Sequence, residues 1–457
     1  MKWLLLAFWI ACTPIVAAHL KRTPAHLRWA AFAMGFIPIM MGLLHLYIAP
    51  ISRPQWAGPI KGVELAMIDF LAIAIIMATP KAKAPLSVVW PWALYFVVIV
   101  FSAAQATLPQ PVFYYAWQVA RAGLVFYAAF RLASYPRTIE AMLWGLFAAI
   151  GYQMFAALLQ ASSGVLQAGG SVGTQNMLGM MSNFGLCASL ALLLRGKQGW
   201  WPIIGFMGAV VVAVLTASRA TLGFAAIGLG LLLFLSCIRQ FTSRKGGFLA
   251  LVVLIAAAVT PLAMQAIDKR KAGNSTASSN YERQAFKRAA WMIIEDHPLG
   301  VGANQYAMIA NVGGYSARAG VAWQVGSRAT NVHQSYLLVM AETSVFGLLA
   351  MLLLLILPVL TAVRGAFRHR RDPRGELLLG LGVAMVTFSL HCLYEWLFVT
   401  ANMQYMLALF AGSAIGLTRL LDRERAERNR AARTPPEPRR AEAETVPVGG
   451  VGAGAAL

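Results

Sequence analysis

The sequence is short of charge, and of acidic charge above all. Charged residues make up 12% of its 457 positions, and 17 Asp and Glu stand against 38 Lys and Arg. A soluble domain carries about 25% charged residues. Here 59% of the residues are hydrophobic and the mean hydropathy is +0.64. This balance excludes an ordinary soluble globular protein.

Cysteine is equally scarce, and its positions exclude two kinds of site. All four cysteines lie within apolar stretches, with neither the spacing of a metal site nor that of a disulfide framework. We expect them to pack as small hydrophobic residues. They are Cys12, Cys187, Cys237 and Cys392.

Long apolar runs recur along the chain and are separated by short polar segments. Runs of about 17 to 25 residues have the length of a bilayer-spanning helix. The sequence therefore predicts an all-α polytopic integral membrane protein with about twelve core transmembrane helices and one additional N-terminal helix. The alternative for this N-terminal helix is a cleaved signal peptide. The predicted spans are 3–18, 29–50, 63–79, 86–104, 112–133, 138–160, 173–194, 200–217, 219–238, 247–265, 332–363, 376–397 and 400–420.

Lys and Arg fall mainly in alternate connections, which predicts the orientation. We assign the cation-rich set to the cytoplasm, which places the C-terminus there. The net charge of +21 follows this distribution and gives no reason to expect nucleic acid. The cation-rich set holds Lys21, Arg22, Arg28, Lys81, Lys83, Arg131, Arg137, Arg195, Lys197, Arg239, Arg244, Lys245, Arg364, Arg368, Arg370, Arg371 and Arg374.

The chain is predicted to divide into four parts. Residues 1–265 hold transmembrane helices 1–10, and 266–331 form a long external, periplasmic cationic loop. Residues 332–420 hold helices 11–13, and 421–457 form a disordered cytoplasmic tail.

The external loop is expected to be partly ordered and to meet anions. Residues 281–294 place Phe286 and Ile293 at helical spacing, and the HPLGVGANQY segment that follows carries turn-forming Pro and Gly. Its positive charge suits an anionic ligand at the membrane surface. The alternative is a solvated loop that meets anionic lipid head groups.

Four sequence pieces occur in a fixed order around this loop: GTQNMLGMMSNFG (173–185), TASRATLGF (216–224), ERQAFKRAAWMIIEDHPLGVGANQY (282–306) and NVHQSYLLVMAETSVFGLL (331–349). Together they resemble the O-antigen ligase and O-antigen polymerase family of bacterial envelope glycosyltransferases. The additional N-terminal helix departs from the family's pattern of about twelve spans.

The resemblance implies a multi-pass enzyme of the bacterial inner membrane whose active side is periplasmic. Such enzymes move a glycan from a polyprenyl (undecaprenyl) diphosphate carrier to an acceptor, without metal or another cofactor. The acceptor is a lipid A-core sugar of lipopolysaccharide, a growing glycan, or a protein hydroxyl. No appended soluble domain for a protein acceptor is visible, which favours the ligase or polymerase type.

The chemistry of this transfer identifies candidate residues. His333 is the candidate catalytic base, because the pKa of an imidazole in water is about 6.5 and it accepts protons at neutral pH. Arg219, Arg283 and Arg288 are candidate ligands of the donor diphosphate, since a guanidinium binds phosphate oxygens as a fork. The alternative interpretation of Arg219 is that its side chain only extends to the membrane interface.

Three further residues are expected to support the site. Glu342 is an intramembrane carboxylate, which is costly and therefore a candidate partner for an arginine or for the site. Gln334 follows His333, and Asn176 opens a predicted span, where it contacts sugar or phosphate or caps the helix.

Other buried charges are expected to pair between helices. Glu64 and Asp69 have Arg121 as a candidate partner, and His391 and Glu395, one helical turn apart, are expected to satisfy each other. These residues also fit a competing function, a secondary transporter or lipid-linked glycan flippase. The absence of internal repeats weighs against that function. A structural scaffold would leave His333 and the arginines without a role.

Overall fold

The computed structural model describes residues 2–80, 86–196, 199–272 and 275–431. It divides into two compact units, Met1–Leu420 and Leu421–Leu457. Lys81, Lys83 and Lys197, together with residues 432–457 of the predicted tail, lie outside the described residues.

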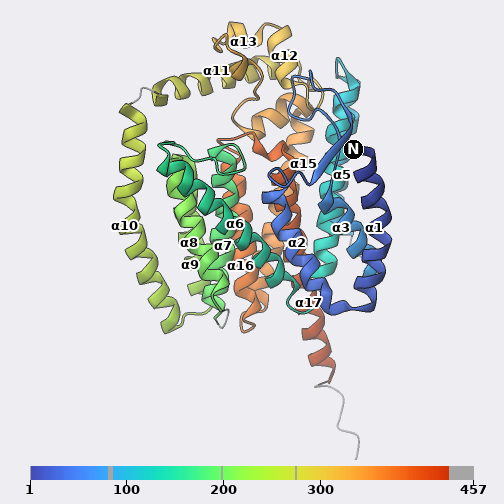
Figure 1. Cartoon of the computed structure of the whole chain (residues 1–457), viewed down its shortest axis with the longest axis vertical. Helices are drawn as coiled ribbons and strands as arrows, with labels where there is room; N and C mark the ends of the chain where they lie inside the picture. Colours follow the sequence, from blue (N-terminus) through green and yellow to red (C-terminus); the bar gives the residue numbers. More distant parts are fainter. Residues whose placement is uncertain (1, 81–85, 197–198, 273–274, 432–457) are drawn as a thin grey trace, which may run out of the picture. The chain divides into compact units, whose positions relative to one another are not determined.

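The first unit is a bundle of helices, shown in Figure 1. Each of the thirteen predicted spans overlaps one of its long helices. These are α1 (Lys2–Arg22), α2 (Leu27–Met40), α3 (Met67–Ala78), α4 (Leu86–Phe101), α5 (Pro109–Leu132), α6 (Thr138–Ser162), α7 (Gln175–Arg195), α8 (Trp201–Leu215), α9 (Arg219–Arg239), α10 (Ser243–Ala272), α15 (Ser335–Arg368), α16 (Arg374–His391) and α17 (Ala401–Ala431).

Among the described residues, six helices are long and apolar enough to cross a membrane by length and composition: α1, α6, α7, α9, α15 and α17. The predicted all-α membrane architecture is thereby confirmed, while the number of crossings stays a prediction.

A two-stranded sheet stands where helix was expected. β1 (Tyr47–Ser52) pairs with β2 (Gly62–Ala66) in antiparallel register, with Tyr47 opposite Ala66. The predicted spans 29–50 and 63–79 were therefore wrong at these ends. Both segments are apolar, but a short apolar run does not distinguish a strand from a helix.

Glycines set the contact between α2 and α6. A Cβ atom on Gly35 would lie 1.9 Å from the backbone oxygen of Met142, and one on Gly145 would lie 1.9 Å from that of Phe32. The two backbones touch at these points, as small residues allow between membrane helices.

The predicted external loop is largely helical. It contains α11 (Ser275–Asp296) and three short helices, α12 (Tyr306–Val312), α13 (Tyr315–Arg318) and α14 (Val325–Arg328). In Figure 1, α11 to α13 lie at the upper end of the first unit. Phe286 and Ile293 are buried, as their helical spacing predicts.

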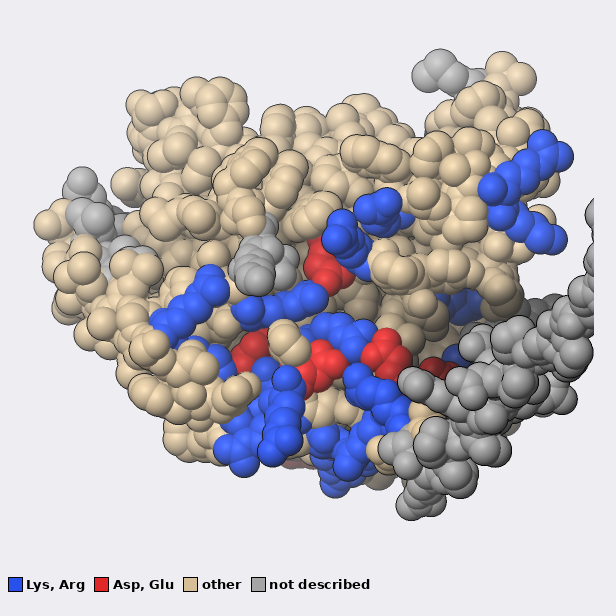
Figure 2. Space-filling view, turned by 90° about the horizontal axis from the view of Figure 1, so that it is seen from below, with Lys and Arg blue, Asp and Glu red and all other residues tan. Residues whose placement is uncertain are grey.

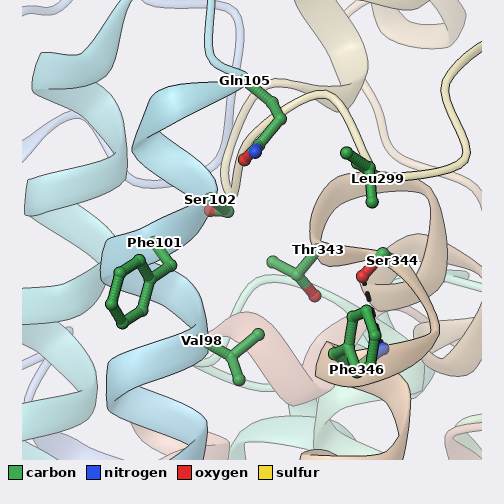
Figure 3. Close-up of a pocket in the computed structure, with 8 residues that line it drawn as sticks. All are labelled: Val98, Phe101, Ser102, Gln105, Leu299, Thr343, Ser344 and Phe346. Carbon is green, nitrogen blue, oxygen red and sulfur yellow. Dashed lines mark hydrogen bonds between the residues drawn. The ribbon is translucent and has the colours of Figure 1, made fainter.

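Helix α15 is broken at Thr343 and Ser344, and the loop inserts at the break. Ser344 has a φ of 65°. The backbone N–H groups of Val301 and Gly302 donate to the carbonyl oxygens of Ala341 (3.1 Å) and Glu342 (2.9 Å). Backbone groups freed by the break thus find partners in the loop. A cavity of about 220 Å³ lies at this point. Figure 3 shows its lining residues, which come from α4, the loop and the broken helix.

Positive charge gathers at the opposite end. Figure 2 shows Lys and Arg on the lower face, with acidic side chains among them. There Glu376, at the start of α16, accepts hydrogen bonds from Arg239 (2.8 Å), Lys245 (2.6 Å) and Ser236 (2.7 Å). This pairing ties the ends of α9 and α16 together.

Candidate functional site

The carboxylate of Glu395 lies at the centre of the candidate site. It follows α16, and its side chain is only 4% exposed. Its Oε1 accepts hydrogen bonds from Arg283 Nη2 (2.7 Å) and Asn176 Nδ2 (2.7 Å). Its Oε2 lies 3.1 Å from Nδ1 of His333. The structure thus brings three predicted site residues together on one carboxylate.

His333 is held just before α15 begins. Ser335, the first residue of α15, donates from its backbone N–H (3.1 Å) and its hydroxyl (2.6 Å) to the backbone oxygen of Glu395. The imidazole packs 5.7 Å from the ring of Phe286, measured between centroids, and is 25% exposed. The start of α15 and the end of α16 are therefore fastened together where the site forms.

Asn176 lies in the first turn of α7. The cap of that helix is Thr174, whose hydroxyl oxygen accepts a hydrogen bond from the N–H of Met177 (3.3 Å). The amide of Asn176 is therefore available to Glu395.

Arg283 and Arg219 approach the site from two helices. Arg283 extends from α11 and is 29% exposed. Arg219, the first residue of α9, donates from Nη2 to Oδ1 of Asn280 (3.3 Å). Asn280 lies one helical turn before Arg283 in α11, so both guanidinium groups lie along the same part of α11.

Arg288, Gln334 and Glu342 lie apart from the Glu395 carboxylate. Arg288 donates to the carbonyl oxygen of Ala319 (2.8 Å), and its guanidinium lies 5.8 Å from the ring centroid of Tyr281. Gln334 is half-buried at the N-terminal boundary of α15. Glu342 accepts the backbone N–H of Tyr306 (2.9 Å), so it orients the loop turn.

The comparisons with known proteins bear on the segment that carries most of these residues. Residues 203–355, about a third of the chain, match a family model described as O-antigen ligase. The predicted resemblance to the O-antigen ligase family is confirmed over this segment. A search of curated proteins finds no match to the chain. The O-antigen ligase segment contains Arg219, Arg283 and His333, whereas Asn176 and Glu395 lie outside it.

One sequence expectation about the site was wrong. His391 does not satisfy Glu395, because its Nε2 lies 2.9 Å from Nδ2 of Asn183 and its ring packs against Phe224. Glu395 was assigned to this local pair and so missed as a site residue. A buried carboxylate at the end of a predicted span was itself a signal of function.

The other expected pairing is confirmed in part. Arg121 Nε donates to Asp69 Oδ2 at 2.8 Å, and the hydroxyl of Tyr405 donates to Oδ1 of the same carboxylate at 2.7 Å. Glu64 is not part of this ion pair. Its backbone oxygen accepts from Trp117 Nε1 (2.6 Å), and the residue lines a separate cavity.

The arrangement can perform proton transfer beside a cation. An ionised carboxylate only accepts hydrogen bonds, and Glu395 pairs with the guanidinium of Arg283, so Nδ1 of His333 is the donor. The other ring nitrogen, Nε2, then has its lone pair available for a proton. A base oriented by a third group is the arrangement used to activate hydroxyl groups.

Proposed function

We propose that this membrane protein is a glycosyltransferase of the O-antigen ligase or polysaccharide polymerase type. It moves a glycan from an undecaprenyl diphosphate carrier to a hydroxyl of an acceptor sugar on the periplasmic face of the inner membrane. The observation that carries the proposal is the convergence of His333 and Arg283 on Glu395. It supplies a base and a phosphate-binding cation at one place, inside a chain of the O-antigen ligase family.

In the proposed step, the acceptor hydroxyl gives its proton to Nε2 of His333. Its oxygen forms a bond to the anomeric carbon as the bond from that carbon to the diphosphate oxygen breaks. The electron pair of the broken bond leaves with the polyprenyl diphosphate. Glu395 stabilises the imidazolium that forms, as the orienting carboxylate does in other triads.

Arginines take up the charge of the leaving diphosphate. Arg283 uses one nitrogen, Nη2, on Glu395, while a guanidinium has five N–H donors and can bind phosphate oxygens with the others. Arg219 adds a second cation beside the same turns of α11. Positioned cations of this kind stabilise charge that develops in a transition state. Arg288 is an outer ligand in this proposal, since its contact with Ala319 has to change before it reaches the phosphate.

The buried ion pair of Asp69 and Arg121 favours the transferase over a transporter. Both partners are only 3% exposed and have Tyr405 as a common third partner. They are thus accounted for as an interhelical contact, and removing one partner is expected to destabilise the fold.

The experiment uses the full-length protein in nanodiscs, undecaprenyl-diphosphate-linked glycan, and rough lipopolysaccharide from a host strain that lacks the gene. Attachment of the glycan to the lipid A core identifies a ligase, and a longer lipid-linked glycan identifies a polymerase. His333→Ala should lower transfer by about 10²–10⁴-fold, the contribution of a positioned base, with donor binding retained. His297→Ala, a change to an exposed loop histidine, is the matched control. Turnover by His333→Ala at the rate of the control would overturn the assignment.

A further inference from the structure

A second cavity, of about 290 Å³, lies near Glu395 and the three side chains that contact it, His333, Arg283 and Asn176. Residues from the β1–β2 hairpin, α5, the start of α7 and the start of α17 form its walls. They are Met41, Gly42, Tyr47, Pro59, Ile60, Glu64, Gln118, Val172, Met177, Val399, Thr400, Ala401 and Asn402.

The cavity adjoins the candidate site along two segments of chain. Its lining residue Met177 follows Asn176, which donates to Glu395, and consecutive Cα atoms are about 3.8 Å apart. On the other wall, Val399 comes four residues after Glu395, within about 15 Å even if the chain were extended. A molecule in this cavity therefore lies next to the group that orients His333.

The polar atoms that the cavity offers are mainly hydrogen-bond acceptors. Gln118 uses its amide nitrogen on Val399 O (2.7 Å) and Gln404 Oε1 (3.1 Å), and Asn402 uses its own on Pro38 O (2.8 Å). Gln118 is left with its amide oxygen, and Asn402 is left with its amide oxygen and one N–H. The lining residues include a carboxylate, Glu64, but neither Lys nor Arg.

Glu64 is the strongest of these acceptors. Within the described residues its carboxylate has no hydrogen-bond donor, although the group is partly buried. A desolvated acceptor without a partner gains from a hydroxyl donor.

The chemistry of the lining favours binding of a sugar ring and disfavours binding of a phosphate. Hydroxyl groups donate to carboxylate and amide oxygens, and the C–H face of a sugar can lie on apolar side chains such as those of Tyr47 and Ile60. A phosphate would meet a carboxylate of like charge and no cation. The cavity and the arginines of the candidate site thus suit different parts of a reaction.

We propose that this cavity binds the sugar ring of the acceptor glycan, with Glu64 accepting hydrogen bonds from its hydroxyl groups. The inference rests on the proposed function and assigns the donor and the acceptor to separate places. The donor diphosphate binds at Arg283 and Arg219, and the acceptor reaches His333 from the side of Glu64.

The test is a kinetic comparison in the nanodisc assay, with donor and acceptor varied separately. The acceptor is rough lipopolysaccharide, or the lipid-linked glycan itself if the product is a longer chain. Glu64→Gln should raise the acceptor KM about tenfold, because a hydrogen bond to a charged acceptor is weakened, and leave kcat unchanged. With rough lipopolysaccharide as acceptor, the donor KM should also stay unchanged. Glu295→Gln, the same change at an exposed position of α11, should leave all of these constants as in the wild type.

A second variant tests the cavity without changing a charge. Gly42 lines the cavity, and a Cβ there meets no atom within 4 Å, so Gly42→Leu should fold and narrow the space. We expect it, too, to raise the acceptor KM. If both variants keep the wild-type acceptor KM, or if either raises the KM of a chemically distinct donor instead, the cavity proposal is overturned while the proposed function stands. If the wild type transfers no glycan to either acceptor, both are overturned.

Discussion

At the scale of single residues, the carboxylate of Glu395 contacts two side chains to which we assign different roles. Arg283 contacts Oε1 and His333 contacts Oε2. A diphosphate that draws Arg283 away would leave more of the carboxylate charge facing His333. That charge would then be better placed to stabilise the imidazolium that forms as the acceptor is deprotonated. We therefore expect donor binding and activation of the acceptor to be coupled through this one side chain.

Glu395→Gln should separate these tasks. The amide keeps the size of the side chain but removes the charge that stabilises the imidazolium, so we expect transfer to fall by about 10²–10⁴-fold, as for the orienting carboxylate of other triads. Donor binding should be retained, since Arg283 is then released from its ion pair. The measurement is transfer rate and donor affinity in nanodiscs. Equal losses of both would show that Glu395 only maintains the fold.

The arginines should differ in their tolerance of lysine. Arg283→Lys should weaken donor binding about tenfold, because a lysine keeps the charge but loses the fork. Arg288→Lys should have a smaller effect, since Arg288 is engaged with Ala319. Donor affinity of both variants, with and without EDTA, is the measurement. We expect EDTA to make no difference; a loss on chelation that Mg²⁺ restores would contradict the arrangement.

The sequence identified part of the candidate site for a definable reason. His333 and Arg283 stand in motifs whose residue types match the chemistry, so each could be identified locally. Glu395 lies 62 positions beyond His333 along the chain, and its helical spacing to His391 offered a partner close by. Only the packing of α15 against α16 shows which partner is used.

At the scale of elements, the predicted external loop is held at the break in α15, the helix that begins beside His333. The apolar run 332–363 continues through Thr343 and Ser344, so hydropathy alone could not reveal the break. The loop inserts there because Gly300 has a φ of 84° and its position leaves no room for a side chain: a Cβ would lie 2.5 Å from the oxygen of Glu342.

Gly300→Ala should therefore loosen the loop from α15. The substitution adds backbone strain of about 1–2 kcal/mol at a positive φ and a clash with backbone. Gly314→Ala is the matched control, since its φ is 72° but a Cβ there meets nothing within 4 Å. We expect a lower melting temperature and slower transfer for Gly300→Ala than for the control, measured by thermal unfolding in detergent and by activity. Identical melting curves would mean that the insertion does not stabilise the loop.

At the scale of the whole molecule, the positions of the helices were the most predictable feature, because a bilayer requires long apolar runs. The β1–β2 hairpin was not, since its short apolar segments carry no signal that separates them from helix ends. The arrangement of charge also followed the predicted pattern: the described Lys and Arg residues of the cation-rich set include Arg239, Lys245 and Arg370, which meet at the ends of α9 and α16.

The orientation itself is testable with single cysteines. Val312→Cys, at an 81% exposed position in the external loop, should react with a membrane-impermeant maleimide in intact spheroplasts. Arg371→Cys, exposed in the connection before α16, should react only after the membrane is opened. The wild type, with its four native cysteines, gives the background. Labelling of Arg371→Cys in intact spheroplasts would reverse the orientation and place the candidate site in the cytoplasm.

The backbone contacts of Gly35 with Met142 and of Gly145 with Phe32 have a consequence for selectivity. Helix α2 leads into the hairpin that forms one wall of the Glu64 cavity, while α6 leads towards α7, whose first turn forms another wall. Two helices that touch backbone to backbone have little freedom to separate, so these walls keep a fixed spacing. If the cavity binds the acceptor sugar as proposed, we expect walls of fixed spacing to exclude a branched sugar wider than the gap and to admit a linear one.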